Sequence, residues 1–232
     1  MSPRGLICCC LTALVAAPIL VSGERAAVPD PAFTQVLERF LSRADSVPAY
    51  RALRRLEARN EQRAVTAWMD VWTEADGAGE FTYGVVAQGG SGLIRSKVFL
   101  ASLETEKKLA RGETPGRAAL TLDNYVFEPR DLAAGLSALG VTPRREDVML
   151  VNGSIFLRPD TGELVRLEGR LSKAPSFWVR QVDVVRRYQH IGGVGLPISL
   201  EAVAKMRLAG HNTFRMTYQY ETVNGQQNES GN

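Results

Sequence analysis

Cysteine and histidine are almost absent from this sequence. The three cysteines are Cys8–Cys10, and the two histidines are His190 and His211. The chain beyond Cys10 therefore has no thiol for a disulfide, for nucleophilic catalysis or for metal ligation. Two histidines without cysteines or a carboxylate at fixed spacing make a poor zinc site. We therefore expect no metal and no cofactor.

A large excess of either charge is also absent. The 232 residues include 28 Lys and Arg against 25 Asp and Glu, which gives a formal net charge of +3. This balance gives no electrostatic case for nucleic acid as a partner. The hydrophobic fraction of 45% and the charged fraction of 23% exclude a disordered or collagen-like chain. The length fits one globular domain, which we place at residues 24–223.

No sequence motif for catalysis occurs. Ser91 lies between glycines but lacks the Gly-x-Ser-x-Gly elbow, and no set of Ser, His and Asp has a supporting motif. The run Gly89–Gly92 matches neither the Walker A loop nor the dinucleotide fingerprint, so it indicates either a weak anion-binding loop or a flexible hinge. We predict that the protein is not an enzyme, and the minor alternative is a hydrolase that uses Ser91 or His211.

The first 23 residues form an apolar segment. Met1–Gly23 contains Arg4 and no acidic residue, and its apolar run is short for a membrane span. This pattern is typical of a secretory signal peptide that is cleaved after Gly23, and the alternative is an uncleaved anchor. Cys8–Cys10 stand near the start of the apolar run, whereas a bacterial lipid-attachment cysteine follows it. We therefore expect no lipid anchor.

Two amphipathic helices are predicted to act as lids. Asp30 and Pro31 fit the N-cap and the first position of a helix whose apolar residues recur at helical spacing. A second helix is predicted from about Leu93 to Arg111, with charged residues on its outer side. The residues expected to point inward are Phe33, Leu37, Phe40, Ile94, Val98, Phe99 and Leu103.

Strand patterns dominate the rest of the chain. Alternating apolar and polar residues between glycine-rich turns predict nine to eleven antiparallel strands. Segment 131–142 fits a helix or a strand, and residues 224–232 are polar enough to form a disordered tail. The predicted strands include Tyr50–Asn60, Ala64–Glu74, Glu80–Ala87, Ala119–Glu128, Val151–Leu157, Leu164–Leu171, Phe177–Tyr188 and Leu196–Leu208.

These elements predict a mainly β fold of the α+β class. An antiparallel sheet of this size must curl. The predicted architecture is one large curved sheet, an incomplete β-barrel, whose concave face is covered by the amphipathic helices. Aromatic residues on the strands either line a cavity or fill an ordinary core, because only the volume between sheet and helices separates the two cases.

Several segments resemble a known family. Gly162–Gly169, Pro175–Val179, and Gly195–Ser199 with the closing strand pair look like the carboxy-terminal half of LolA-like proteins, the superfamily of outer-membrane lipoprotein sorting. The predicted second helix also looks like that of bacterial members of this group. The resemblance implies a periplasmic, incomplete barrel whose apolar cavity holds acyl chains. It also implies that an arginine of an early strand ties down the helical lid, and Arg51, Arg54, Arg55 and Arg59 lie on that strand here.

The predicted function is binding of a lipid, an acyl chain or a lipoprotein by a non-enzymatic periplasmic carrier or sensor. We expect a monomer that is peripheral to the membrane after signal cleavage. The alternative is a regulatory module of the same fold that grips an envelope protein. The candidate cavity-lining residues are Trp68, Trp72, Phe81, Tyr83, Tyr125, Phe127, Phe156, Trp178, Phe214, Met216 and Tyr218.

Overall fold

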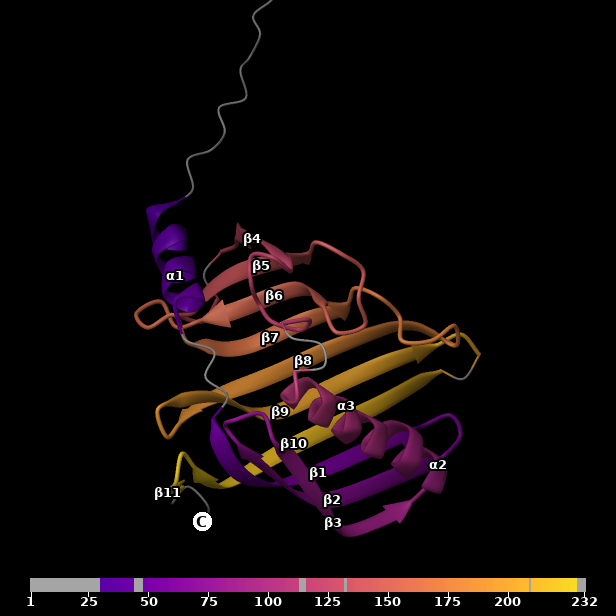
Figure 1. Cartoon of the computed structure of the whole chain (residues 1–232). Coiled ribbons are helices and arrows are strands. Elements are labelled where there is room, and N and C mark those ends of the chain that lie inside the picture. The colour runs from indigo at the N-terminus through magenta and orange to yellow at the C-terminus, as the bar shows by residue number, and fades with distance from the viewer. Residues whose placement is uncertain (1–29, 44–47, 113–115, 132, 209, 229–232) are drawn as a thin grey trace, which may run out of the picture.

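One antiparallel sheet with two helical segments makes up the described part of the chain (Figure 1). The computed structural model describes residues 30–43, 48–112, 116–131, 133–208 and 210–228. The predicted signal peptide, residues 1–23, lies outside the described residues. Within the described ranges, no helix is long and apolar enough to span a membrane.

The sheet has eleven strands and stays open. Its order is β3-β2-β1-β10-β9-β8-β7-β6-β5-β4, and β11 pairs with β10. The predicted fold class, a mainly β protein with one large antiparallel sheet, is therefore confirmed. The strands are β1 (Ala49–Asn60), β2 (Val65–Asp76), β3 (Phe81–Gly90), β4 (Tyr125–Pro129), β5 (Ser137–Pro143), β6 (Val151–Leu157), β7 (Leu164–Leu171), β8 (Val179–Ile191), β9 (Val194–Met206), β10 (His211–Val223) and β11 (Gln226–Gln227).

The first helix, α1 (Pro31–Leu41), begins as its sequence predicts. The Asp30 side chain accepts a hydrogen bond from the Ala32 amide at 3.0 Å, and Pro31 occupies the first turn, where its missing N–H costs nothing. Val36 is the buried residue of its apolar face.

The second helical segment is continuous but has three parts, α2 (Gly92–Ile94), the π-helix η1 (Arg95–Leu100) and α3 (Ala101–Ala110). The Ser91 hydroxyl caps it by accepting a hydrogen bond from the Ile94 amide at 3.4 Å. The sequence predicts that Val98 points inward, yet Val98 is 42% exposed and its neighbour Phe99 is fully buried. A π-helical turn contains more residues than an α-turn, and this shifts which side chains face the sheet.

Glycines shape two strand ends. Gly192 and Gly193 form the two-residue turn between β8 and β9 with φ of 57° and 83°, which matches the positive φ pair of a type I′ hairpin. Gly90 has φ of 77°, and a Cβ there would lie 2.2 Å from the Thr66 carbonyl oxygen. The glycine run before the second helix thus lets β3 approach β2 closely.

Three further segments differ from the expectations. In the predicted strand Ala119–Glu128, the strand β4 starts only at Tyr125, because a turn precedes it in which the Asn124 side chain donates to two carbonyls. Segment 131–142, which fitted a helix or a strand, contributes to β5. Gln226–Gln227 of the predicted disordered tail pair with β10, while residues 229–232 lie outside the described residues.

Candidate functional site

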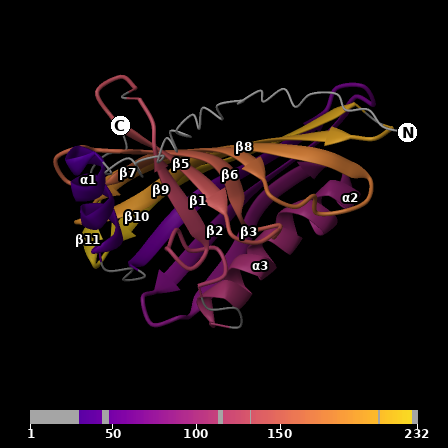
Figure 2. The same ribbon diagram turned by 90° about the horizontal axis from the view of Figure 1, so that it is seen from above.

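Two apolar clusters lie on one face of the sheet, which we call the inner face. The α3 cluster lies beneath the second helical segment and contains buried residues of β1, β2, β3, β9 and β10 together with Phe99 and Leu103. The α1 cluster lies beneath α1 and contains Val36 with buried residues of β4 to β7. In the view from above, α1 and α3 lie at opposite sides of the molecule (Figure 2).

A row of paired residues shows that both clusters share this face. Residues paired across an antiparallel sheet point to the same side, and one such row crosses seven interstrand pairings from β2 to β5. We call it the central row. Its members, in order, are Met69, Leu56, Met216, Leu200, Arg186, Leu167, Ile155 and Leu139.

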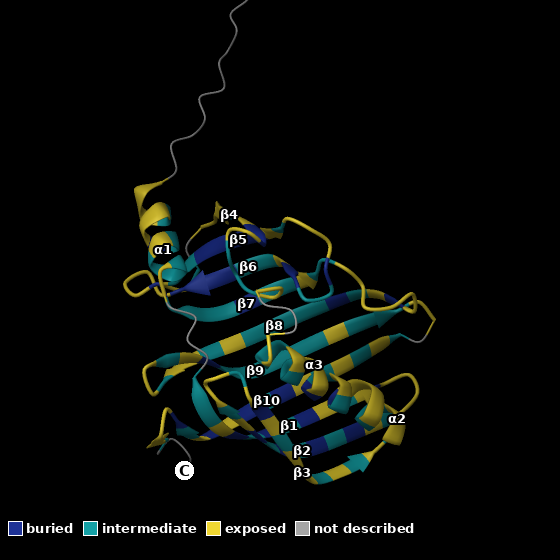
Figure 3. Ribbon diagram, in the orientation of Figure 1, coloured by how far each residue is buried: buried dark blue, intermediate teal, exposed yellow. Residues whose placement is uncertain are grey.

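The middle of the inner face is less covered than its two ends. Leu167 is the buried residue of β7, Leu196 that of β9, and Val179 and Val182 those of β8. Figure 3 shows these strands mostly teal, between the dark blue stretches of β5–β6 and β1–β2. Each helical segment therefore covers its own cluster and leaves a strip around β8 and β9 between them.

Arg54 fastens the second helical segment to the sheet. Its guanidinium donates to both carboxylate oxygens of Glu106, with Nη1–Oε2 at 2.6 Å and Nη2–Oε1 at 2.8 Å. Nη2 also lies 2.7 Å from the Tyr50 hydroxyl. Arg54 is 1% exposed and Glu106 is 38% exposed, so α3 places a carboxylate over a cation buried in the sheet. Such bidentate, charge-assisted pairs are among the stronger hydrogen bonds in proteins.

Aromatic rings enclose this ion pair. The Arg54 guanidinium carbon lies 4.7 Å from the centre of the Tyr218 ring and 5.3 Å from that of Phe81. Burial raises the pKa values of Tyr50, Tyr218 and Tyr220 above their ordinary value, so these hydroxyls stay protonated at neutral pH. Burial alone would lower the pKa of Arg54, but the hydrogen bonds and charge of Glu106 outweigh it and raise that pKa.

An open cleft of about 700 Å³, which we call the α1 cleft, lies between the end of α1 and the β8–β9 hairpin. Arg43 and Glu163 are its charged residues, and their side chains lie 3.6 Å apart. Its volume is within the range of small-molecule sites, roughly 300 to 1,000 Å³. Its lining residues are Phe40, Leu41, Arg43, Pro48, Ala118, Ala119, Leu120, Thr121, Glu163, Leu164, Tyr188, Gly193, Val194 and Gly195.

The end of α1 is fixed to the β6–β7 turn by polar contacts. Arg39 Nη1 donates to the Pro159 carbonyl at 2.9 Å, and Arg43 Nη1 donates to that of Thr161 at 3.2 Å. Gly162 approaches so closely that a Cβ there would lie 2.8 Å from the Phe40 amide nitrogen. One wall of the α1 cleft is thus held by hydrogen bonds from two arginine side chains to backbone carbonyls and by the close approach of Gly162.

The predicted cavity residues fall into two groups. One group lies on the inner face and comprises Phe81, Tyr83, Tyr125, Phe127, Phe214, Met216 and Tyr218. The other lies elsewhere: Trp68, Trp72 and Phe156 lie on the outer face, and Trp178 precedes β8 with 58% exposure.

Arginines cover the outer aromatic rings. The guanidinium carbons of Arg55, Arg51 and Arg166 lie 4.3, 4.4 and 3.9 Å from the ring centres of Trp68, Trp72 and Phe156, respectively. Cation–π contacts of this kind explain why both faces of these strands carry apolar residues. A ligand on the inner face would not reach these three rings, but whether any predicted residue contacts a ligand stays a prediction.

The predicted lid residues follow the two helices. Phe33, Leu37 and Phe40 pack against the α1 cluster. Ile94, Phe99 and Leu103 pack into the α3 cluster, and Val98 is the one of this set that does not turn inward.

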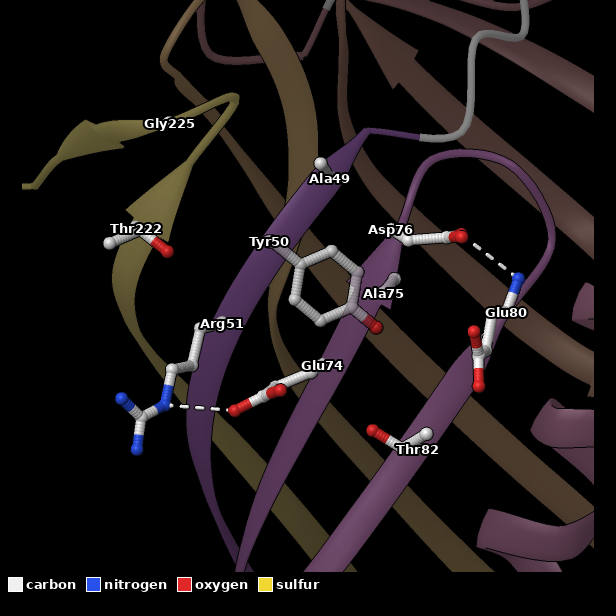
Figure 4. Close-up of a pocket in the computed structure, with 10 residues that line it drawn as sticks. All are labelled: Ala49, Tyr50, Arg51, Glu74, Ala75, Asp76, Glu80, Thr82, Thr222 and Gly225. Carbon is white, nitrogen blue, oxygen red and sulfur yellow. Dashed lines mark hydrogen bonds and ion pairs between the residues drawn. The ribbon is translucent and has the colours of Figure 1, made fainter.

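A second hollow, of about 500 Å³, lies at the end of β1, β2 and β3 (Figure 4). Arg51 there contacts Glu74 at 3.1 Å and Glu221 at 3.0 Å. The Asp76 carboxylate accepts the Ala78 and Glu80 amides of the β2–β3 turn, which lowers its pKa. The charges of Arg51, Glu74 and Asp76 are thus used within the fold.

Of the two residues of the hydrolase alternative, Ser91 has a structural role through its side chain, whereas His211 contributes its backbone amide. Ser91 caps the second helical segment, and the His211 amide donates to Gln62 Oε1. His190 Nδ1 lies 2.9 Å from Glu163 Oε1. Over the residues that the structure describes, no group of three or more His, Cys, Asp or Glu could hold a metal ion.

Comparison with known proteins finds similarity at the level of structure. No family model matches the chain, and no curated protein matches it. A DUF1329 family protein from Desulfovibrio piger is similar with a TM-score of 0.40 and 10% identity, over 87% of this chain and 92% of that one. A LolA superfamily protein from Nitrosomonas europaea is similar with a TM-score of 0.39 and 10% identity, over 84% and 94%.

A third solved structure is MucB in complex with MucA(peri). Its TM-score is 0.22 at 14% identity, over 81% of this chain and 93% of that one. The resemblance seen in the sequence names the same superfamily as the Nitrosomonas protein. Similarity of this degree supports no conclusion about a ligand or a partner.

Sequence reasoning did not single out several residues of the inner face. The sequence predicts Glu106 on the outer side of its helix. For Arg186 and its neighbour Arg187 it favours a solvated sheet face, with contact to anionic headgroups or an acidic partner as the alternative, and it gives Tyr188 no role. The alternation of side chains along β8 places Arg186 and Tyr188 on the same face, so the sequence pattern could have indicated that the two residues lie together. No sequence pattern indicated that Glu106 is the partner of Arg54, because the π-helical turn before it changes which side chains of the helix face the sheet.

Proposed function

We propose that this protein binds an amphiphile, a lipid or an acylated protein, on the inner face of its sheet, and that it acts as an exported carrier or sensor without catalysis. The observation that carries this proposal is the division of one apolar sheet face into two separately covered clusters with the α1 cleft beside them. A mostly apolar cleft with few polar groups is the usual form of a small-molecule site.

The construction of the two covers supports this function. The second helical segment is held by the buried Arg54–Glu106 pair, whereas α1 is held at its end by Arg39 and Arg43. A carrier needs a cover that stays folded while its contacts with the sheet change. Two independent helices, each with its own cluster, allow one to move while the other stays packed.

Native mass spectrometry tests the proposal. The full chain is expressed with its own N-terminus and purified from a bacterial periplasm without detergent. We expect an adduct with the mass of a fatty acid or phospholipid that is lost on denaturation. Saturable displacement of the neutral dye Nile red by lauric acid, with one site per chain, is the second readout. Absence of both an adduct and saturable binding would refute the proposal.

A second function, binding of a protein partner, is favoured by one exposed aromatic pair. Phe177 is 73% exposed, Trp178 is 58% exposed and Leu208 on the neighbouring hairpin is 83% exposed. Arg207 positions the pair, since its Nε donates to the Phe177 carbonyl at 2.7 Å and its amide to that of Trp178 at 3.0 Å. Clustered exposed aromatic residues are typical of interaction surfaces.

Affinity capture from envelope extract separates the two functions. The wild-type chain is compared with a chain that carries Phe177→Ser and Trp178→Ser, both on the surface and so without cost to the core. A protein retained by wild type, lost from the variant and free of bound lipid would favour the second function. Equal capture by both chains would count against it.

A further inference from the structure

One charged side chain interrupts the apolar central row. Arg186 of β8 pairs in register with Leu167, a buried member of the α1 cluster, and with Leu200, which packs against the α3 cluster. Arg186 therefore projects from the inner face between the two clusters. It is half-buried, and a cation in such surroundings is costly unless an anion offsets its charge.

No carboxylate among the described residues lies within ion-pair distance of Arg186. Glu106 interacts with it electrostatically, but both carboxylate oxygens of Glu106 are bound by Arg54. Arg54 stands on β1, three strands away from β8, which is roughly 14 Å at about 4.8 Å per strand. Glu106 is thus the carboxylate with which both arginines interact, and Arg54 holds both of its oxygens.

The neighbours of Arg186 are hydroxyl groups rather than acids. Tyr188 and Tyr218 both interact with its guanidinium. Burial raises the pKa of Tyr218, so at neutral pH this side chain is uncharged and can only donate or accept a hydrogen bond. Interaction with Tyr188, Tyr218 and Glu106 raises the pKa of Arg186, so the guanidinium stays charged although no carboxylate pairs with it directly.

The α1 cleft begins beside this charge. Tyr188 lines the cleft, and it lies two residues from Arg186 on the same strand, which is about 7 Å along the strand. An apolar chain that fills the cleft from the α1 side would end near the guanidinium. The charged residues that line the cleft itself, Arg43 and Glu163, already pair with each other.

We propose, on the basis of the proposed function, that Arg186 binds the anionic head of an amphiphile, a carboxylate or a phosphate, whose chain lies in the α1 cleft. Arginine presents a planar fork of donors that matches both oxyanions in a bidentate way. The Tyr188 hydroxyl is placed to donate a further hydrogen bond. The inference adds the class of ligand to the proposed function: an anionic rather than a neutral amphiphile.

The test compares three ligands with the same chain on the full-length protein. Lauric acid, lauryl phosphate and 1-dodecanol displace Nile red, a neutral reporter that does not itself need a cation. A charge-assisted pair contributes about 1.5 to 3 kcal/mol, or roughly 10- to 100-fold in Kd. We expect wild type to bind one or both anionic ligands at least tenfold more tightly than the alcohol, and the stronger anion identifies the head as carboxylate or phosphate.

Two arginine variants locate the preference. Arg186→Met is expected to remove the preference for the anion while the Kd of 1-dodecanol changes less than about threefold, and Arg186→Lys should keep part of it. Arg215→Met is the matched control, because Arg215 is exposed on the outer face of the same sheet. The preference is the ratio of the Kd of 1-dodecanol to the Kd of the anionic ligand for the same variant. A small loss of folded protein therefore affects both values alike and leaves the ratio unchanged.

Each other outcome overturns the inference in a recognisable way. Equal binding of anions and alcohol by wild type would refute it and leave the proposed function intact. A preference that survives Arg186→Met, or that is lost equally in Arg215→Met, would refute the role of Arg186. Failure of all three ligands to bind would refute the proposed function and this inference together.

Discussion

Removal of Glu106 should destabilise the protein more than removal of its partner Arg54. Glu106→Gln leaves the Arg54 guanidinium, 1% exposed, without its anion, whereas Arg54→Met leaves Glu106, 38% exposed, free to turn into water. Breaking a buried pair costs about 3 to 5 kcal/mol when a charge stays buried. Because water reaches Glu106, we expect the lower end, about 3 kcal/mol.

The expected cost of Arg54→Met is smaller, about 1 kcal/mol. Methionine fills much of the same volume and removes the cost of burying a charge, which is often neutral for stability. The remaining loss comes from the contact with the Tyr218 ring at 4.7 Å and from the hydrogen bond to Tyr50. The double variant should resemble Arg54→Met, because no orphaned cation is left.

Urea unfolding measures these differences, with the midpoint compared at unchanged slope. Hydrogen exchange in residues 92–110 reports whether the second helical segment opens first, and Glu106→Gln should lower its protection before that of β5 and β6. Glu104→Gln is the control, since Glu104 is exposed and, among the described residues, accepts a hydrogen bond from the Tyr83 hydroxyl alone. If Arg54→Met costs as much as Glu106→Gln or more, the account of a buried cation held by a half-exposed acid is wrong.

Three further predictions concern the stability of the protein at low pH, the close approach of Gly90 to β2, and the side chains that the π-helical turn directs toward the sheet. Hydrogen bonding from Arg117 lowers the pKa of Asp147 in the folded state. The stability that Asp147 contributes is therefore present above its unfolded pKa of about 3.8 and is lost as the pH falls through the lower folded pKa. Asp147→Asn should make the free energy of unfolding less dependent on pH below about 4, as measured by urea unfolding at several pH values. Gly90→Ala should cost at least about 1 kcal/mol more than Gly112→Ala in urea unfolding, because both have positive φ but only Gly90 meets backbone. Phe99→Ala should lower the unfolding free energy by about 3 to 5 kcal/mol and Val98→Ala by less than about 1, and the reverse order would refute the π-helical phase.

The strands of this fold were largely predictable from alternation. Val151–Leu157 and Leu164–Leu171 are strands at the predicted bounds, since turn residues and period-two patterns mark both. The pattern of β2 was harder to interpret, because Trp68 and Trp72 make its outer face as apolar as its inner one. Their cover is Arg55 and Arg51, whose cation–π contacts depend on a neighbouring strand and leave no mark in the local sequence.

The candidate site was less predictable than the sheet. Four arginines of β1 were equivalent in sequence as anchors for the helix, and only the tertiary structure selects Arg54, the one that is buried beneath α3. The phase of that helix also depends on a π-helical turn, for which the sequence carries no motif. Alternation in the sequence shows on which face of the sheet a strand residue lies. The residue that contacts it, on a neighbouring strand or on a helix above the sheet, is determined by tertiary packing.

The two arginines of the inner face differ in what satisfies them. Both Nη atoms of Arg54 are bonded within the chain, to Glu106 and Tyr50, so its charge is used to hold α3. Arg186 stands in the apolar central row, where it interacts with tyrosine hydroxyls, and its side chain is half-buried whereas that of Arg54 is fully buried. A protein that needed only a stable core would place an apolar residue there, as it does at Leu200 and Leu167 on either side. We therefore assign this charge the binding role proposed above, because its position between two separately covered clusters is where a chain entering from the α1 cleft would bring an anion.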